Sequence, residues 1–214
     1  MDLAGIQATL KTLDIDAWLL YDFHGINPIA RRVIGLGEKR FATRRWFGLV
    51  PATGEAIWLH HAIEAHLFTH VPGRRIPFVG YRELQEKLRE TVKGVKRVAM
   101  EYVPGGAIPY VSRVDAGTIE MVRACGVQVV SSADLVQHFE ARWSPEALES
   151  HRRAARGLKE VLQATFDHVA RAAGKGGTIT EHSVQQFMCD QFSDRGFHHD
   201  PPIVAVNAHS GNPH

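Results

Sequence analysis

Hydrophobic and polar positions in residues 1–140 form short blocks whose period changes from one block to the next. Short apolar runs predict buried strands, whereas apolar residues three or four positions apart predict helices with one packed face. The expected strands are residues 16–21, 45–50, 55–60, 75–79, 96–102 and 127–130. The expected helices are residues 3–13, 28–33, 62–71, 81–92, 111–125 and 132–139. Strands that alternate with helices indicate a mixed α/β sheet with helices on its faces.

One pair of neighbouring strands has no helix between its members. Residues 51–54 separate the runs 45–50 and 55–60, with proline first and glycine last. Such a short turn between two apolar runs predicts a hairpin. The sheet is therefore expected to contain at least one antiparallel pair.

A second segment begins at Ser144-Pro145-Glu146. Serine suits the N-cap, proline the first helical position and glutamate the positive end of the helix dipole. The predicted helix reaches the glycine-rich break at residues 174–177 and keeps one apolar face for about six turns. That face consists of Leu148, Ala155, Leu158, Leu162, Phe166 and Val169. We therefore expect two domains, residues 1–141 and 142–214.

A second helix is expected after residues 178–181, which have the spacing of a capping box. Residues 203–206 predict a buried strand, and the Gly, Asn and Pro residues of 207–213 predict a loop that presents His214. Two helices and one strand bury little apolar surface alone. We expect residues 142–214 to be the beginning of a larger domain.

Composition narrows the class of protein. The 214 residues are 44% hydrophobic and 22% charged, so a packed core is expected. A net charge of +2, with Lys and Arg scattered along the chain, argues against a nucleic-acid partner. The two cysteines form no disulfide framework, and no apolar run approaches the roughly 20 residues needed to span a bilayer. Together with an amino terminus that lacks signal-peptide features, this predicts a soluble cytoplasmic protein without a membrane partner.

The sequence contains 13 histidines, a high number that makes incidental metal binding plausible. His198, His199, Asp200, His209 and His214 form the densest group of possible metal ligands. Adjacent histidines point in different directions, and neither a cysteine nor a His-Glu-x-x-His motif supports them. We therefore predict no metal site from these residues.

Two further stretches allow both a functional and a structural interpretation, and three serines favour a structural one. His61, Glu64 and His66 lie where a hairpin strand enters a helix and could line a cleft. Arg44 and Arg45 could bind an anionic group or could be solvated charges at a strand start. The serines lack a nucleophile-elbow setting and are expected to cap helices. They are Ser112, Ser131 and Ser132.

The order of these elements and several short stretches resemble the Xaa-Pro aminopeptidase and prolidase family. Likeness to its creatinase-type N-terminal domain lies in residues 16–22, 44–47, 108–110 and 114–118. Likeness to its catalytic domain lies in residues 144–146, 178–181, 203–207 and 212–214. The resemblance implies a mixed-sheet N-terminal domain followed by the first helices and strand of a pita-bread fold.

The resemblance also implies a mechanism. In that family two divalent metal ions (Mn, Co or Zn), held by Asp, Asp, His, Glu and Glu, activate a water that attacks the peptide bond before proline. A histidine ahead of the first metal ligand helps to bind substrate, and His214 matches it by its place after the strand and turn. We therefore expect His214 to be catalytic and His61 and His209 to bind a proline-containing dipeptide or peptide. A homodimer is the expected assembly.

All of these metal ligands follow that histidine in the family, and the sequence ends at His214. We expect the chain to be the amino-terminal part of a longer peptidase, to bind no metal of its own and to be inactive alone. Two alternatives remain open: a creatinase-like amidinohydrolase, and a non-catalytic binding or dimerisation protein with the same fold.

Overall fold

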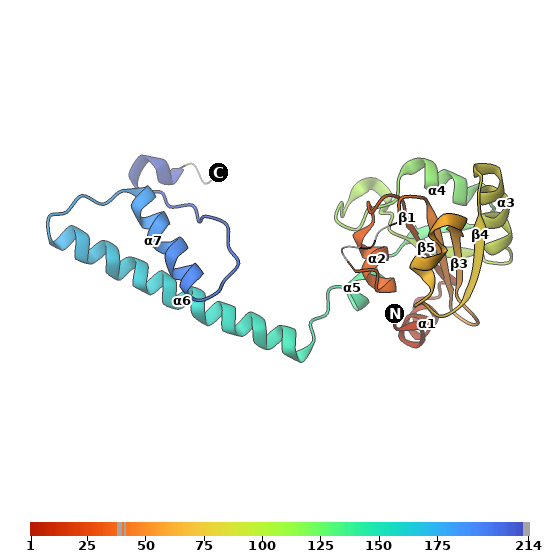
Figure 1. Cartoon of the computed structure of the whole chain (residues 1–214), viewed down its shortest axis with the longest axis horizontal. Helices are drawn as coiled ribbons and strands as arrows, with labels where there is room; N and C mark the ends of the chain where they lie inside the picture. The colour runs from red at the N-terminus through yellow and green to blue at the C-terminus, as the bar shows by residue number, and fades with distance from the viewer. Residues whose placement is uncertain (38–39, 41, 212–214) are drawn as a thin grey trace. The chain divides into compact units, whose positions relative to one another are not determined.

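The computed structural model describes residues 1–37, 40 and 42–211 of the chain. Contacts divide the chain into two compact units, unit 1 (Met1–Arg142) and unit 2 (Trp143–His214), each described by itself (Figure 1). Within the described ranges, no helix is both long and apolar enough to cross a membrane.

Unit 1 is built on a six-stranded sheet with the order β4-β3-β2-β1-β5-β6. The strands are β1 (Ala17–Asp22), β2 (Trp46–Pro51), β3 (Ile57–His61), β4 (Arg74–Phe78), β5 (Arg97–Met100) and β6 (Gln128–Ser131). Strand β2 runs antiparallel to both of its neighbours, whereas β1, β3, β4, β5 and β6 are parallel to one another. The predicted hairpin is therefore confirmed as β2–β3.

Helices cover both faces of this sheet (Figure 1). On one face α1, α2, the 3-10 helix η1 and α5 contribute to the same hydrophobic cluster. On the other face α3 and α4 do so. Their bounds are α1 (Leu3–Thr12), α2 (Pro28–Ile34), η1 (Ala62–Phe68), α3 (Tyr81–Thr91), α4 (Ala116–Arg123) and α5 (Ala133–Phe139). The mixed α/β fold with helices on the sheet faces is confirmed.

Strand β1 lies inside the sheet and is buried along its whole length. Side chains alternate between the faces of a strand, so Trp18 and Leu20 join one hydrophobic cluster while Leu19 and Tyr21 join the other. Helices on both faces leave no face of β1 for water. This explains why its sequence is an unbroken apolar run rather than an alternating one.

Two predicted helices of unit 1 differ from the structure. The helix expected over residues 111–125 begins only at Ala116, because the Asp115 side chain accepts a hydrogen bond from the Thr118 amide and serves as N-cap. The segment expected to be helical over 62–71 is the 3-10 helix η1. A short 3-10 helix η2 (Pro104–Gly106) also lies between β5 and α4.

Unit 2 consists of α6 (Pro145–Gly174), α7 (Glu181–Asp194) and a 3-10 helix η3 (Asn207–Gly211). The predicted start of α6 is confirmed, since Ser144 Oγ accepts a hydrogen bond from the Ala147 amide. The capping box predicted for residues 178–181 is wrong, because the observed one begins two residues later. Thr180 is the N-cap of α7, and its partner is Ser183.

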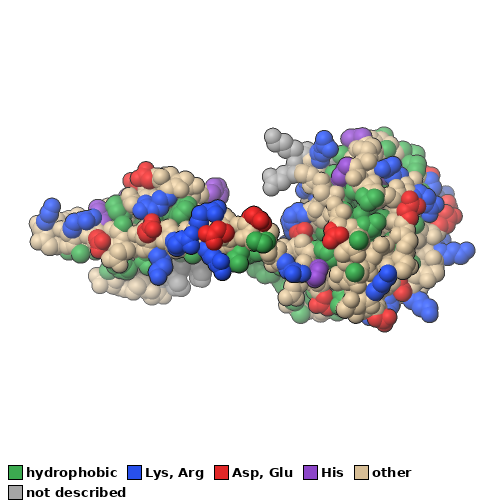
Figure 2. Space-filling model, turned by 90° about the horizontal axis from the view of Figure 1, so that it is seen from below, with side chains coloured by type: hydrophobic (Ala, Val, Ile, Leu, Met, Phe, Trp, Pro, Cys, Tyr) green, Lys and Arg blue, Asp and Glu red, His purple; other side chains and the backbone are tan. Residues whose placement is uncertain are grey.

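The apolar face predicted for α6 is not the face that the described structure buries. Helix α6 buries Gly157, Val161 and Thr165, whereas Leu158 and Leu162 are each 50% exposed. A Cβ on Gly157 would lie 2.4 Å from Cζ of Phe197, so the glycine permits the close approach of the segment after α7. Apolar side chains therefore lie between charged ones on the surface of unit 2 (Figure 2).

Residues 203–206 do not form the predicted strand. They are assigned to no helix or strand, and Ile203 and Val206 are 69% and 57% exposed. A strand needs a hydrogen-bonded neighbour, and no strand of the described chain pairs with this segment. The loop predicted for 207–213 contains η3 at residues 207–211, while residues 212–214 lie outside the described part of the chain.

Candidate functional site

One edge of the unit 1 sheet gathers the ends of several strands. Strands β1, β3, β4, β5 and β6 are parallel, so their carboxyl ends meet there, and the antiparallel β2 begins at the same edge. Open α/β sheets generally bind ligands beyond the carboxyl ends of their strands. We call this edge the carboxyl edge and expect a ligand-binding site there.

Exposed apolar side chains single out the same edge. In the described part of unit 1, every large hydrophobic side chain that is exposed follows the carboxyl end of β1, β3, β4 or β5. These residues are Phe23, Ile26, Ile63, Val79, Tyr81, Ile108 and Tyr110. Three of them, Phe23, Val79 and Tyr81, line one hollow, and apolar surface that is exposed together in this way often marks a place of contact.

Part of this edge is hollowed. A cavity of about 150 Å³ is lined by residues that follow β1 and β4, precede β2 and end β3. They include Phe23, Arg44, Arg45, His61, Val79 and Tyr81. The structure thus brings together His61 and the arginine pair, which the sequence offered as separate candidates.

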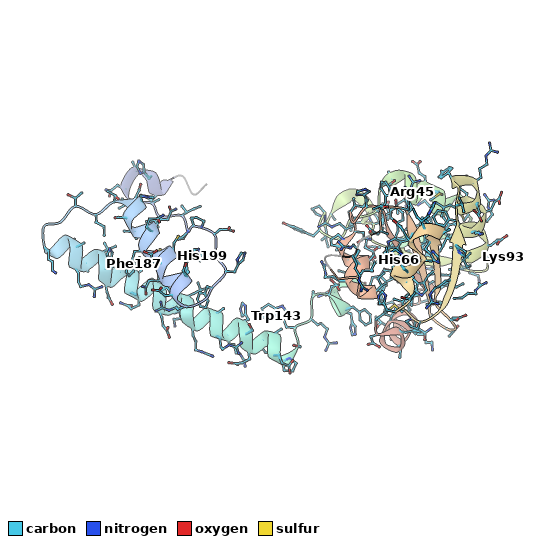
Figure 3. All side chains as sticks on the ribbon, viewed as in Figure 1. Arg45, His66, Lys93, Trp143, Phe187 and His199 are labelled. Atoms are coloured by element: carbon cyan, nitrogen blue, oxygen red, sulfur yellow. The ribbon has the colours of Figure 1, made fainter. Side chains whose placement is uncertain are left out.

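Glu64 fixes the backbone that carries the two arginines. One of its carboxylate oxygens accepts hydrogen bonds from the Thr43 amide and hydroxyl, both at 2.7 Å, and the other accepts from the Arg44 amide at 3.2 Å. Glu64 is itself buried, whereas His66 is exposed on η1 (Figure 3). Of the three residues proposed to line a cleft, His61 lines the hollow, Glu64 supports it and His66 does neither.

Arg45 lies over two aromatic rings. Its guanidinium carbon lies 5.6 Å from the ring centroid of Phe23 and 5.8 Å from that of Tyr81. Such cation–π contacts attract the guanidinium to the faces of the two rings. The Tyr21 hydroxyl also hydrogen-bonds the Arg45 side chain, and burial raises the pKa of that hydroxyl, so it stays protonated.

His61 has a partner for each ring nitrogen. Nε2 lies 3.0 Å from the Val79 carbonyl oxygen, and Nδ1 lies 3.4 Å from the Ile63 amide nitrogen. A carbonyl can only accept, so the arrangement selects the tautomer with a proton on Nε2 and an accepting Nδ1. In this structure His61 joins β3 to the segment after β4. Its predicted contact with substrate stays a prediction.

A buried polar network that the sequence did not reveal lies below the same edge. Glu101 accepts hydrogen bonds from Trp18 Nε1 and Asn27 Nδ2, both at 2.7 Å, and from Ser132 Oγ at 3.1 Å. Ser132 occupies the N-cap position of α5 as predicted, but its hydroxyl binds this carboxyl group and not the helix. The network joins the ends of β1 and β5 to the starts of α2 and α5.

Two carboxyl groups in this region have raised pKa values. Burial raises the pKa of Glu101, although its three donors favour the charged form. Burial likewise raises the pKa of Asp22, against the hydrogen bonds from the Asn27 and Gly25 amides. Asp22 Oδ1 lies 2.8 Å from the Asn27 nitrogen, so both acids help to hold the turn from β1 into α2.

In unit 2, His209 is tied to Glu181. Its Nδ1 lies 2.8 Å from Oε2 of Glu181, and the Val206 amide donates to Oε1 at 2.7 Å. The hydrogen bond from His209 lowers the pKa of Glu181, with the Val206 amide acting in the same direction. The predicted role of His209 in substrate binding stays a prediction, and His214 lies outside the described residues.

Metal ligands do not gather in the described part of the chain. No three His, Cys, Asp or Glu residues there come close enough to hold an ion. His199 (Figure 3) lies against the ring of Phe192, with centroids 5.2 Å apart, and its Nε2 is 3.2 Å from Ser193 Oγ. The described residues therefore do not fit the pair of metal ions that the family resemblance implies.

Unit 1 has the fold of the creatinase/prolidase N-terminal domain. Its structure is similar to that domain of an X-Pro dipeptidase from Streptococcus pyogenes, with a TM-score of 0.50 and 14% identity over 64% of this chain and 97% of the other. A proline dipeptidase from Streptococcus pneumoniae gives a TM-score of 0.52 and 16% identity over 66% of this chain and 98% of that one.

The likeness to solved structures extends over both units. A dipeptidase from Pyrococcus horikoshii matches 100% of this chain and 56% of its own, with a TM-score of 0.58 and 15% identity. A prolidase from Thermococcus sibiricus matches 99% of this chain and 55% of its own, with a TM-score of 0.56 and 13% identity. The chain thus spans about half the length of these proteins. No protein-family model and no curated protein matches the sequence.

Proposed function

We propose that the chain is the amino-terminal part of a metal-dependent peptidase that cleaves Xaa-Pro bonds. The observation that carries the proposal is the match of the whole chain to one half of a dipeptidase and of a prolidase. The sequence resemblance supports it independently, since it rests on short motifs in both units. Under this proposal the parent enzyme holds two divalent metal ions and forms a homodimer.

The two units have different roles in this proposal. Unit 1 is a packed α/β domain that presents the carboxyl edge. Unit 2 supplies the first helices of the catalytic domain and carries His214 at the place of the substrate-binding histidine. The metal ions supply the activated water, and they are held by residues outside this chain.

A matched pair of assays tests the proposal. The 214-residue chain and the longer product of its reading frame are each incubated with Ala-Pro and with Ala-Ala in the presence of Mn²⁺. The longer product is expected to cleave Ala-Pro only and to lose activity with a chelator. The 214-residue chain is expected to cleave neither dipeptide, and strong activity from it would contradict the proposed location of the metals.

Other outcomes would replace the proposal by one of its alternatives. Hydrolysis of creatine in place of Ala-Pro by the longer product would identify an amidinohydrolase. Absence of both hydrolysis and metal binding would identify a binding or dimerisation protein. In an active parent, His214→Ala is expected to lower kcat without changing the metal content, because the histidine is proposed to bind substrate and not metal.

A further inference from the structure

We propose that the hollow at the carboxyl edge of unit 1 binds the free carboxylate of a short peptide. Arg44 and Arg45 would bind the carboxylate, and the apolar part of the ligand would lie against Phe23 and Tyr81. This inference rests on the proposed function only for the choice of a peptide as the carrier of the carboxylate.

Arg44 and Arg45 bring positive charge to the lining of the hollow. Neither Arg44 nor Arg45 forms an ion pair within the described part of the chain. None of the described side chains that line the hollow is acidic. Guanidinium groups bind carboxylates through paired hydrogen bonds of matching geometry, so two of them beside one hollow favour a carboxylate ligand.

Two carboxylates near the hollow, Glu64 and Glu83, have hydrogen-bond donors other than the arginine side chains. Glu64 uses both oxygens on the backbone and hydroxyl donors of residues 43–44. Glu83, in the first turn of α3, pairs with Lys87 through Oε1 and accepts from the Val79 amide through Oε2 at 2.7 Å. Among the described residues neither carboxylate forms an ion pair with Arg44 or Arg45, so N–H donors of both guanidinium groups remain for a ligand.

Contacts within the protein already hold both arginines in place. The Glu64 contacts fix the backbone, two aromatic rings and the Tyr21 hydroxyl hold the Arg45 side chain, and Arg44 Nη1 donates to Thr43 Oγ1 at 3.0 Å. Side chains fixed in advance lose less conformational entropy on binding.

Apolar side chains beside the arginines would contact the apolar part of the ligand. Tyr81 and Val79 are 56% and 69% exposed, and Phe23 is 39% exposed, so each has surface free for contact. Flat aromatic surface is a common docking place for proline rings. In a dipeptide that ends in proline the ring lies directly beside the carboxylate. This arrangement matches the hollow, where the two arginines lie beside the rings of Phe23 and Tyr81.

The test measures binding to the 214-residue chain itself by NMR or calorimetric titration with Ala-Pro and with Ala-Pro amide. Ala-Pro is expected to bind at least about tenfold more tightly than the amide, because loss of a charge-assisted contact typically costs more than 1.4 kcal/mol. Arg45→Gln is expected to weaken Ala-Pro binding by about the same factor, and Arg44→Gln to weaken it in the same direction.

Arg123→Gln is the matched control. Arg123 also lies over an aromatic ring, 5.0 Å from the Tyr102 centroid, but does not line the hollow. This variant is expected to bind Ala-Pro as tightly as the unchanged chain does. Thermal unfolding of each variant is measured first, and only variants that are folded at the temperature of the titration are compared.

Three results would overturn the inference. These are equal binding of Ala-Pro and its amide, unchanged binding by Arg45→Gln, and binding of inorganic phosphate as tight as that of Ala-Pro, which would indicate a general anion site. The assay involves no hydrolysis. Failure of the carboxylate site is therefore distinguishable from failure of the proposed peptidase activity.

Discussion

Unit 1 and unit 2 use apolar residues in opposite ways. In unit 1 the helices on both faces of the sheet bury whole clusters of large side chains, among them Trp18, Leu20 and Phe47 at 0% exposure. Among the described residues of unit 2, only three hydrophobic side chains are buried: Val161, Val184 and Phe192. The first unit has its own core, whereas the second buries only a narrow seam between α6 and α7.

This difference teaches that helix length is not a measure of independent stability. Helix α6 has 30 residues, yet most tertiary stabilisation of a helix comes from packing of its apolar face. That face, with Leu158, Leu162 and Phe166, is half or more exposed. We therefore expect the stability of the described chain to reside in unit 1.

The largest expected effect is in hydrogen exchange of the whole chain. Amides of β1, which is buried throughout and paired on both sides, are expected to exchange orders of magnitude more slowly than those of α7. Mass spectrometry of exchanged peptides measures both in one experiment. Equal protection of the two elements would show that unit 2 has a stability comparable to that of unit 1.

A pair of leucine truncations sharpens the comparison. Leu20→Ala removes a fully buried side chain and is expected to lower the free energy of unfolding by about 2–5 kcal/mol. Leu162→Ala removes a side chain that is 50% exposed and is expected to change it by less than about 0.5 kcal/mol. Denaturant titrations followed by tryptophan fluorescence and circular dichroism measure both. A large loss from Leu162→Ala would reveal that this face is covered in solution.

Gly157→Ala tests the seam of unit 2. Alanine favours a helix over glycine by about 1 kcal/mol, but the added Cβ would lie 2.4 Å from the Phe197 ring. Overpacking typically costs about 1–3 kcal/mol, so loss of the α6–α7 contact is expected despite the gain in helix propensity. Exchange protection of α7 is the readout. Adding Phe197→Ala is expected to remove the clash, and a stabilised α7 in the single variant would refute the close contact.

Glu101 is expected to make unit 1 sensitive to pH. Its folded pKa lies above its unfolded value of about 4.3, so the stability that its protonated form contributes is fully present below that pH. This contribution is lost as pH rises through the folded pKa, at up to about 1.4 kcal/mol per pH unit. Glu101→Gln is expected to abolish this part of the pH dependence, as measured by denaturant titration from pH 4 to 8. A variant with an unchanged slope would show that Glu101 does not titrate between the two states.

The smallest expected effect is at the start of α6. Ser144→Ala removes the hydroxyl that accepts from the Ala147 amide, and loss of an N-cap typically costs about 1 kcal/mol. Fraying of the first turn of α6, seen by hydrogen exchange, is the measurement. Ser150→Ala is the matched control, because it makes the same substitution within α6 but away from the cap, and it is expected to leave the first turn unchanged.

The predictable part of the fold was the part governed by local sequence. Apolar runs and helical spacing located the strands and most helices of unit 1, and Ser144-Pro145 located the start of α6. The helix predicted over residues 111–125 begins too early, because apolar periodicity does not show that Asp115, four residues after Val111, is its N-cap. The wrong face of α6 and the missing strand at 203–206 share one cause: periodicity indicates which residues are apolar, but not what covers them.

The candidate site was predictable only in pieces. His61, Arg44 and Arg45 were each singled out, but their meeting at one hollow depends on the order and direction of the strands. The Glu101 network could not be foreseen, because Trp18 and Asn27 lie 83 and 74 residues from it in the sequence. A lone glutamate after an apolar run gives no sign of the donors that surround it in the fold.

The reversed direction of β2 has a consequence for how such a protein can change. Strand β2 begins at the edge where its neighbours end, so the segment just before it, residues 42–45, lies at the carboxyl edge. That segment can vary in length and charge while the paired residues 46–51 keep their places between β1 and β3. New binding preferences can therefore arise in this segment, with little disturbance of the residues that make the chain fold.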